Sequence, residues 1–302
     1  MLEGSGEGIA NPERKERGAN VEIIIKFMRH GERDKNAVLT NYGREVTKQR
    51  AQESGIGTTD FDAVKAIGSN ADPSVSGMGR ALETADIYAH EIAGDEAFKT
   101  RARKILSYES ITTPSPYNHR KVYNSHLPEN FAELSDEEKV RVSKVAQSAT
   151  LNHMMSIKTP EADAFRRENA GAFAEVVHHY TLMVRRLHSD SRVLIPAGSH
   201  GGNLELLLQQ ALVHQIDDRE RVGFSDLSEI GGDIDPSEAF NVTIKTDEDG
   251  ELLPLQVTFD NPNRPHGEMH LSPKVLEQVR LFWESLHQGS DEEPEEPAQP
   301  ES

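Results

Sequence analysis

Buried β-strands are indicated by short runs of apolar, β-branched residues along the chain. Residues 21–28 (VEIIIKFM) form a continuous run of this kind, which is typical of a strand covered on both faces. Residues 63–69 (AVKAIGS) and 192–198 (RVLIPAG) repeat the pattern, and residues 103–108 (RKILSY) show a weaker version of it. These four segments are the predicted strands of a central sheet.

Helices are predicted where apolar residues recur every three to four positions. Thr40 is a favourable N-cap and Gly55 a favourable stop, so they predict a helix that ends at about Ser54. Ser135 and Glu138 form a capping box at the start of another helix. That helix is expected to run to about residue 155, and further helices are expected at 79–92, 161–188, 203–213 and 272–287.

The order of these elements predicts the fold class. Strands and helices alternate from residue 21 to about residue 213, as they do where parallel strands are joined by helical crossovers. Residues 240–246 and 252–260 are strand-like, and the DEDG turn between them predicts a hairpin. We therefore predict an α/β fold, a three-layer sandwich with a mostly parallel sheet, followed by a C-terminal hairpin and helix.

The two ends of the chain lack this patterning. Residues 1–20 show no apolar periodicity, and residues 288–302 contain six carboxylates, three prolines and no large apolar side chain. Segments of this composition cannot bury enough apolar surface to become ordered. We therefore predict disordered tails at 1–20 and 288–302, with 21–287 as a single domain.

Charge and composition narrow the possible partners. The chain of 302 residues has a net charge of −18, and this disfavours binding to nucleic acid and to anionic membranes. Cysteine is absent, which excludes disulfides, iron–sulfur clusters and thiol nucleophiles. No apolar run approaches the ~18–20 residues of a membrane span, and the N-terminus lacks the apolar region of a signal peptide. We therefore expect a cytoplasmic protein.

Candidate chemistry begins where the first predicted strand ends, at Arg29-His30-Gly31. Open α/β sheets bind their ligands at the carboxyl ends of their strands. Arg29 offers a fork of donors suited to phosphate or carboxylate, and His30 is a possible nucleophile, base or ligand. Gly31 would let the backbone approach a bound oxyanion because it has no Cβ.

Further motifs follow in order along the chain. They are Glu32 and Asn36, Leu39-Thr40-x-x-Gly43, Ser76-x-x-x-Arg80-Ala81-x-x-Thr84-Ala85, Leu106-x-x-Glu109, and Ser199-His200-Gly201-Gly202 after the strand at 192–198. Together with Arg29-His30-Gly31, this series resembles the histidine phosphatase superfamily, whose best-known members are the cofactor-dependent phosphoglycerate mutases. The resemblance covers residues 21–213 and implies a phosphoglycerate mutase-like fold.

The resemblance also implies a mechanism. His30 would attack phosphorus to give a phosphohistidine, while Arg29, Arg80, His200 and Asn36 bind the phosphate. Glu109 stands where the family keeps its proton donor, with Glu32 and Glu205 as alternative acids. Neither a metal nor another cofactor is required, because the arginines neutralise the phosphate charge. The structural alternative for Arg80 is an ion pair with Glu83 on the same helix face.

The segments at 110–160 and 214–270 are interpreted as family-specific insertions. The mutases carry a Tyr-Gly-x-Leu-x-Gly-x-x-Lys segment after the acid, and this chain does not. In the first insertion, Arg120 and Lys121 follow His119 in a basic cluster. Together with Arg33 they would bind a second anionic group on the substrate, and a solvated loop is the alternative.

We therefore predict a hydrolase, a phosphatase acting on a phosphorylated small molecule. A phosphoprotein, including phosphohistidine on a protein, is the alternative substrate. Two alternative functions are a phosphoglycerate mutase-type phosphotransferase and a phosphate-binding module without catalysis. The presence of His30, Arg29, Arg80 and His200 together argues against the last of these.

Overall fold

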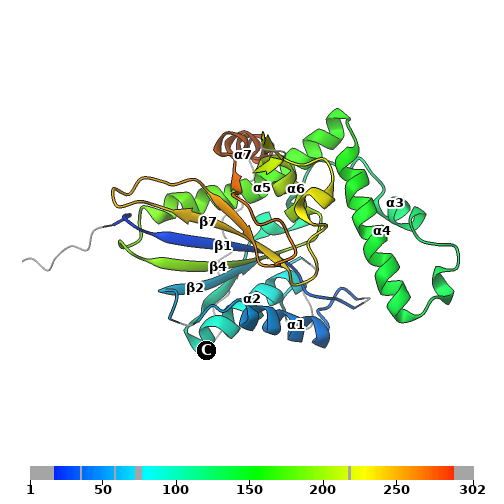
Figure 1. The fold of residues 1–302 in the computed structure, drawn as a ribbon, viewed down its shortest axis with the longest axis horizontal. Coiled ribbons are helices and arrows are strands. Elements are labelled where there is room, and N and C mark those ends of the chain that lie inside the picture. The colour runs from blue at the N-terminus through cyan, green and yellow to red at the C-terminus, as the bar shows by residue number, and fades with distance from the viewer. Residues whose placement is uncertain (1–16, 35, 58, 72–76, 217–218, 289–302) are drawn as a thin grey trace, which may run out of the picture.

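The fold is built around one large twisted sheet (Figure 1), seen in a computed structural model that describes residues 17–34, 36–57, 59–71, 77–216 and 219–288. Its strands run in the spatial order β3-β2-β4-β1-β7-β8-β9-β5-β6. The strands are β1 (Glu22–Arg29), β2 (Ala63–Gly68), β3 (Phe98–Ala102), β4 (Arg192–Ser199), β5 (Leu212–Ile216), β6 (Arg219–Val222), β7 (Ala239–Lys245), β8 (Gln256–Phe259) and β9 (His270–Leu271).

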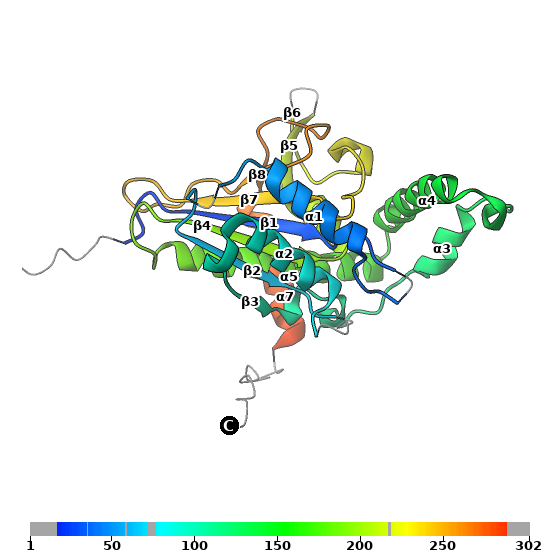
Figure 2. The same cartoon turned by 90° about the horizontal axis from the view of Figure 1, so that it is seen from below.

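Helices cover both faces of this sheet. They are α1 (Asn41–Glu53), α2 (Arg80–Ala93), α3 (His119–Ser125), α4 (Asp136–Ser156), α5 (Pro160–Val184), α6 (Asn203–Ala211) and α7 (Pro273–His287). Helices α1 and α2 lie on one face, and α5, α6 and α7 lie on the other (Figures 1 and 2). Helices α3 and α4 lie beyond the ends toward which β1 and β4 run. The expectation of three layers is therefore confirmed.

The burial of both faces of β1 explains why its sequence is a nearly continuous apolar run. Successive side chains of a strand point to opposite faces of the sheet. Ile25 and Phe27 belong to the core beneath α5, where the Phe27 ring lies 5.4 Å from the Phe173 ring. Met28 belongs to the core beneath α1 and α2, together with Tyr88. Both faces of β1 are buried, so neither set of positions can be polar without a partner.

The expectation of a mostly parallel sheet is wrong for the sheet as a whole. Parallel pairing joins β1 to β4, β4 to β2 and β2 to β3. Every pairing from β7 onward is antiparallel, including that of β7 with β1. Parallel neighbours need long crossovers, whereas antiparallel neighbours can be joined by short turns. After residue 213 the chain returns through such turns, and the predicted hairpin of β7 and β8 is one of them.

The prediction of a strand at 103–108 is also wrong. Two short 3-10 helices, Lys104–Leu106 and Tyr108–Ser110, occupy this segment, and the third strand of this region is β3 at 98–102. Strand β3 is an edge strand whose side chains are mainly exposed, so its sequence, FKTRA, has no apolar alternation. Leu106 in this turn is fully buried. In the sequence, such a buried apolar residue is hard to distinguish from one in a strand.

Helix starts follow their predicted caps. Thr40 caps α1 by accepting a hydrogen bond from Gly43 N at 2.9 Å, and Gly55 follows the helix with a φ of 66°. The Ser135–Glu138 capping box opens α4. Helix α5 ends at Val184, four residues before the expected end. These caps are local interactions, which is why the sequence predicts them well.

The first residues described do not form a tail. Gly18 N donates to Leu187 O at 3.0 Å, and Thr246 Oγ1 donates to Gly18 O at 2.6 Å. The predicted N-terminal tail is therefore wrong for residues 17–20, and its residues 1–16 lie outside the described part of the chain, as does 289–302 of the acidic tail. None of the helices in the described ranges has the length and apolarity needed to cross a membrane.

Candidate active site

The two motif histidines lie side by side where β1 and β4 end. These strands pair in parallel with Arg29 opposite Ser199, so His30 and His200 follow at neighbouring positions. His30 N donates to Ser199 O at 3.0 Å, and the two imidazole rings are 5.4 Å apart between centroids. Both side chains are largely buried. Residues 170 positions apart in sequence thus meet because parallel strands present their carboxyl ends at one edge.

Helix α2 brings Arg80 to the same edge. Leu82 N donates to Ser69 O at 3.1 Å, which joins the first turn of α2 to the end of β2. A Cβ on Gly198 would lie 1.9 Å from Ala81 O, so glycine is required for α2 to pack this closely against β4. Arg80 begins the helix and is buried. Its position is therefore fixed by the packing of α2 on two strands.

The carboxylate of Glu83 is bound by Arg44, so it does not need Arg80 as its partner. Glu83 Oε1 accepts a hydrogen bond from Nε of Arg44 on α1 at 2.8 Å. Arg80 Nη2 instead lies 3.3 Å from His200 Nδ1. The guanidinium of Arg80 is thus directed to the ends of the strands.

His30 is held as a neutral imidazole with a defined tautomer. Its Nδ1 donates to the carbonyl oxygen of Gly31 at 2.7 Å, which places the ring proton on Nδ1 and leaves Nε2 with its lone pair. Burial is the main cause that lowers the pKa of His30 to about 3, and the positive charges of Arg80 and Arg29 add to it. The ring is therefore unprotonated at neutral pH, as a nitrogen nucleophile must be.

His200 has both ring nitrogens engaged by the protein. Because the Arg80 guanidinium can only donate, His200 Nδ1 accepts from it. The other nitrogen, Nε2, then carries the proton and donates to Ser69 Oγ at 3.1 Å. The Tyr108 ring packs against the imidazole with its centroid 5.3 Å away. This arrangement fixes the ring of His200 next to His30 and Arg80.

Arg29 is held from one side only. Its Nη1 donates to Ile234 O at 2.6 Å and lies 3.5 Å from Asp233 Oδ2. Its Nε is buried and has no hydrogen-bond partner among the described residues. A Cβ on Gly201 would lie 2.8 Å from this Nε, so a side chain at position 201 would cover it. A buried donor without a partner is costly, and an oxyanion bound here would satisfy it.

Gly31 has a different role from the one expected. Its N–H donates to Thr84 Oγ1 at 2.9 Å, so this amide is already engaged by the protein. A Cβ at this position would lie 2.7 Å from Leu39 Cδ1 and 3.0 Å from Ser237 Oγ. A side chain at position 31 would displace the end of Leu39 in the loop before α1, and the carbonyl of Gly31 orients His30.

Other predicted residues are not joined to this cluster by contacts. Asn36 and Arg33 are exposed on the loop between β1 and α1, and the contact found for Asn36 is its own N–H donating to Asp34 Oδ1 at 2.9 Å. In the described residues, no hydrogen bond or ion pair joins either side chain to His30. Arg120 and Lys121 are exposed on α3.

The three candidate acids differ in their surroundings. Glu109 is exposed in the turn that follows Tyr108, and its carboxylate forms no ion pair in the described ranges. Glu32 is exposed as well. Glu205 is fully buried, which raises its pKa, and its carboxylate accepts hydrogen bonds from Gly202 N and Ile234 N. Glu205 is thus buried near Arg29 and is not exposed to solvent.

Sequence reasoning missed several residues that hold the cluster. Ser69 and Thr84 contact His200 and Gly31 directly, and Tyr108 packs on His200. Asp233 and Ile234 contact Arg29. Ser69 has a local signal, because it stands at the end of a buried strand, and Thr84 stands one turn beyond Arg80. Asp233 and Ile234 lie in a loop with no such signal.

The chemistry of the site is that of an anion receptor with a nucleophile. The charges of Arg29 and Arg80 act on His30, and these two guanidinium groups can stabilise charge on a phosphoryl group. In the part of the chain that the structure describes, no group of three or more histidine and carboxylate side chains could hold a metal ion. The residues in contact are thus suited to binding an anion.

Comparisons with known proteins give distant likenesses. No protein-family model matches the sequence, and no curated protein matches it. Among solved structures, mycobacterial hydrolase 2 is similar with a TM-score of 0.45 and 13% identity, covering 86% of this chain and 97% of its own. The apo form of a Hafnia alvei phytase has a TM-score of 0.45 and 11% identity, covering 91% of this chain and 98% of its own.

A third similar structure is the native form of a mycobacterial glucosyl-3-phosphoglycerate phosphatase. Its TM-score is 0.42 and its identity 12%, with 81% of this chain and 100% of that chain covered. At one edge of its sheet, this chain brings together Arg29, His30, Arg80 and His200, the residues on which its resemblance to the histidine phosphatase superfamily rests.

Proposed function

We propose that this protein is a phosphatase of the histidine phosphatase type, which hydrolyses a phosphomonoester through a phosphohistidine on His30. The observation that carries the proposal is the state of the His30 ring. Its Nδ1 donates to Gly31 O, its pKa is lowered to about 3, and its neighbours are Arg29, Arg80 and His200. A general base works best when its pKa lies near the operating pH, and the pKa of His30 lies well below neutral pH.

The first step transfers the phosphoryl group to the protein. His30 Nε2 attacks phosphorus while the bond from phosphorus to the ester oxygen breaks. The leaving alkoxide takes a proton from an acid, for which Glu109 is the proposed residue. Arg29 and Arg80 bind the phosphoryl oxygens, and His200, whose Nδ1 accepts from Arg80, holds the Arg80 guanidinium in position.

The second step regenerates the protein. Water attacks the phosphohistidine, the bond from nitrogen to phosphorus breaks, and inorganic phosphate leaves. The same carboxylate that gave its proton in the first step accepts one from the attacking water. Glu109 is exposed beside Tyr108, which packs on His200, so substrate and water can reach it from the solvent.

Hydrolysis is favoured over relocation of phosphate. The mutase segment after the acid is absent, and the 110–160 insertion forms α3 and α4 instead. A panel of phosphorylated metabolites and an aryl phosphate would be tested for release of inorganic phosphate. We expect release by the wild type and a loss of at least about 10³-fold in His30→Ala.

The matched control is His153→Ala, because His153 is an exposed histidine on α4. It should turn over at the wild-type rate. If His30→Ala and His153→Ala released phosphate equally, the proposal would be wrong. A phosphorylated isomer formed without free phosphate would indicate a mutase.

A further inference from the structure

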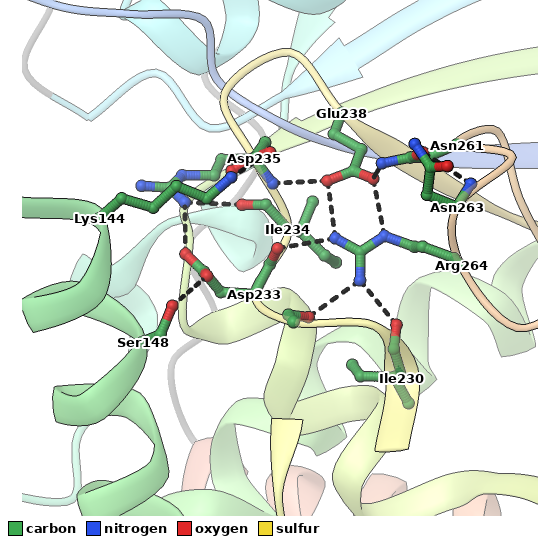
Figure 3. A network of polar contacts seen from close by, with 12 residues as sticks. Lys144, Ser148, Ile230, Asp233, Ile234, Asp235, Glu238, Asn261, Asn263 and Arg264 are labelled. Carbon is green, nitrogen blue, oxygen red and sulfur yellow. Dashed lines mark hydrogen bonds and ion pairs between the residues drawn. The ribbon is translucent and has the colours of Figure 1, made fainter. Parts of the chain in front are cut away.

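Asp233 is a buried carboxylate that faces Arg29. Its Oδ2 lies 3.5 Å from Arg29 Nη1, with exposed side-chain fractions of 4% for Asp233 and 16% for Arg29. Its other oxygen, Oδ1, accepts a hydrogen bond from Ser148 Oγ of α4 (Figure 3). The carboxylate of Asp233 is thus shared between the proposed phosphate-binding arginine and the α4 insertion.

The backbone that carries Asp233 is firmly held. Arg264 is buried and donates to the carbonyl oxygens of Ile230, Gly232 and Asp233 at 2.7–2.9 Å. It also forms a two-bond ion pair with the carboxylate of Glu238 (Figure 3). These bonds hold the backbone of the loop in place. A substitution of Asp233 should therefore change its side chain and leave the backbone of the loop where it is.

Helix α4 contacts the same loop through one polar stripe. Lys144, Ser148 and Asn152 are spaced by four residues and therefore lie on one face of the helix. Lys144 Nζ donates to Asp235 Oδ2 at 2.8 Å, and Asn152 Oδ1 accepts from Leu227 N at 2.9 Å. Ser148, the middle member, is the one that reaches Asp233.

The distance between Arg29 and Asp233 is longer than in a direct hydrogen bond between a guanidinium and a carboxylate. Hydrogen bonds between a guanidinium and a carboxylate usually measure about 2.7–2.9 Å, compared with 3.5 Å here. Arg29 Nη1 makes its short bond to Ile234 O instead. The Ser148 hydroxyl stabilises the Asp233 carboxylate in this withdrawn position, so it offsets part of the attraction of Arg29.

We propose that Asp233 is a counter-ion that competes with the substrate phosphate for Arg29, and that Ser148 on α4 sets the strength of this competition. The proposal rests on the proposed function, in which Arg29 binds the phosphoryl oxygens. A carboxylate this close to a guanidinium in a poorly solvated site weakens the attraction of the guanidinium for a second anion. Asp233 is thus a positioning residue that never touches the substrate.

The proposal predicts opposite effects for the two partners. Asp233→Asn keeps the shape of the side chain but removes the competing charge, so phosphate should bind at least about fivefold more tightly. Ser148→Ala releases the carboxylate toward Arg29, so phosphate should bind at least about threefold more weakly. Because Ser148 acts through Asp233, the double variant should bind phosphate like Asp233→Asn alone.

The experiment uses inorganic phosphate as the probe. Its dissociation constant is measured by calorimetry, and its inhibition constant is measured against an aryl phosphate, for the wild type and the three variants. Ser143→Ala is the matched control, since Ser143 is a serine of α4 outside the polar stripe. Thermal unfolding of each variant verifies that it is folded at the assay temperature.

Opposite shifts and the non-additive double variant would support the proposal. Weaker binding in both single variants would show that Asp233 and Ser148 only stabilise the loop, and unchanged binding in both would show that Asp233 does not compete. Either result overturns the inference while leaving the proposed function intact. A wild type that binds no phosphate, with Arg29→Ala unchanged, would overturn the proposed function and the inference together.

Discussion

Nδ1 of His30 donates a hydrogen bond of 2.7 Å to the carbonyl oxygen of Gly31, the next residue in the chain. This bond determines which ring nitrogen carries the proton, and it leaves Nε2 with its lone pair. The acceptor belongs to the same Arg-His-Gly motif, so the motif contains both the proposed nucleophile and the group that orients it. The N–H of Gly31 in turn donates to Thr84 Oγ1, which holds Gly31 in place.

The residues around His30 should be required individually for turnover. Arg29→Ala and Arg80→Ala should each lower kcat/KM at least about 10²-fold, which is the scale of losing one donor to a transition state. His200→Ala should lower it by a similar factor, because it removes the acceptor that holds Arg80 in position. Steady-state assays with an aryl phosphate measure the loss. Arg101→Ala is the matched control, because Arg101 is exposed on the outer strand β3, which β2 and β4 separate from β1. A variant that kept the rate of this control would remove that residue from the site.

The phosphohistidine should accumulate when its hydrolysis is slowed. Glu109→Gln lacks the base proposed for the second step, so after mixing with substrate it should carry one added phosphoryl group on His30. Rapid quenching without acid, followed by mass spectrometry of the peptides, locates the group. Phosphate on another residue would disprove the assignment of the nucleophile. Absence of any adduct would show that Glu109 is not the acid–base residue or that water attacks directly.

The basic cluster of α3 should affect substrates selectively. If it binds a second anionic group, replacing His119, Arg120 and Lys121 together with Ala should raise KM for the best metabolite substrate more than it lowers kcat. An aryl phosphate has no second anionic group and should be converted at the wild-type rate. Kinetics on both substrates make the comparison. Equal effects on the two, or no effect on either, would favour a solvated helix.

The lowered pKa of His30 should make the protein less stable in acid. The folded state has a pKa of about 3 and the unfolded state one near 6.5, so between these values the unfolded chain binds the extra proton. This contribution is fully present above pH 6.5 and is lost as the pH falls toward 3. His30→Asn cannot take up the proton. Relative to this variant, the wild type should lose about 2 kcal/mol between pH 6.5 and 5.

Urea denaturation of the wild type and His30→Asn at several pH values measures this difference. All other titrating groups are common to the two proteins, so their contributions cancel. A constant difference in the free energy of unfolding from pH 8 to pH 5 would mean that His30 is protonated as readily in the folded protein as in the unfolded chain. That result would remove the main support for a neutral nucleophile.

The close approach of α2 to β4 should depend on Gly198. A Cβ there would lie 1.9 Å from Ala81 O, a backbone atom of the helix that begins with Arg80. Gly198→Ala should therefore cost about 2 kcal/mol or more in stability and displace Arg80, lowering turnover as well. Gly267→Ala is the control, because nothing lies within 4 Å of its Cβ position. Equal melting temperatures for the two variants would contradict the packing argument.

Local features of the fold could be predicted from the sequence because their causes lie within a few residues. The Thr40 cap, the Ser135–Glu138 box and the apolar run of β1 each show in neighbouring letters. Strand β3 could not be predicted, since an edge strand with exposed side chains has no apolar pattern. The mixed sheet was missed because strand direction is set by which distant strands pair.

The motif residues of the site were identified for a similar reason. Arg29, His30, Arg80 and His200 stand at predicted strand ends and at a helix start, and parallel strands present such ends at one edge. Asn36 and Arg33 follow the same motif in sequence, but they lie exposed on a loop without a contact to His30 in the described residues. Position in a motif does not determine the direction of a loop side chain.

By itself, the sequence determined the residue types that gather at the candidate site and the elements that carry them. Only the tertiary structure decided their state. Burial lowers the pKa of His30, Arg80 determines the tautomer of His200, and Asp233 reaches Arg29 from 204 positions away. The physical reason is that solvation and charge act through space. They depend on what packs around a group, and neighbours along the chain supply little of that packing.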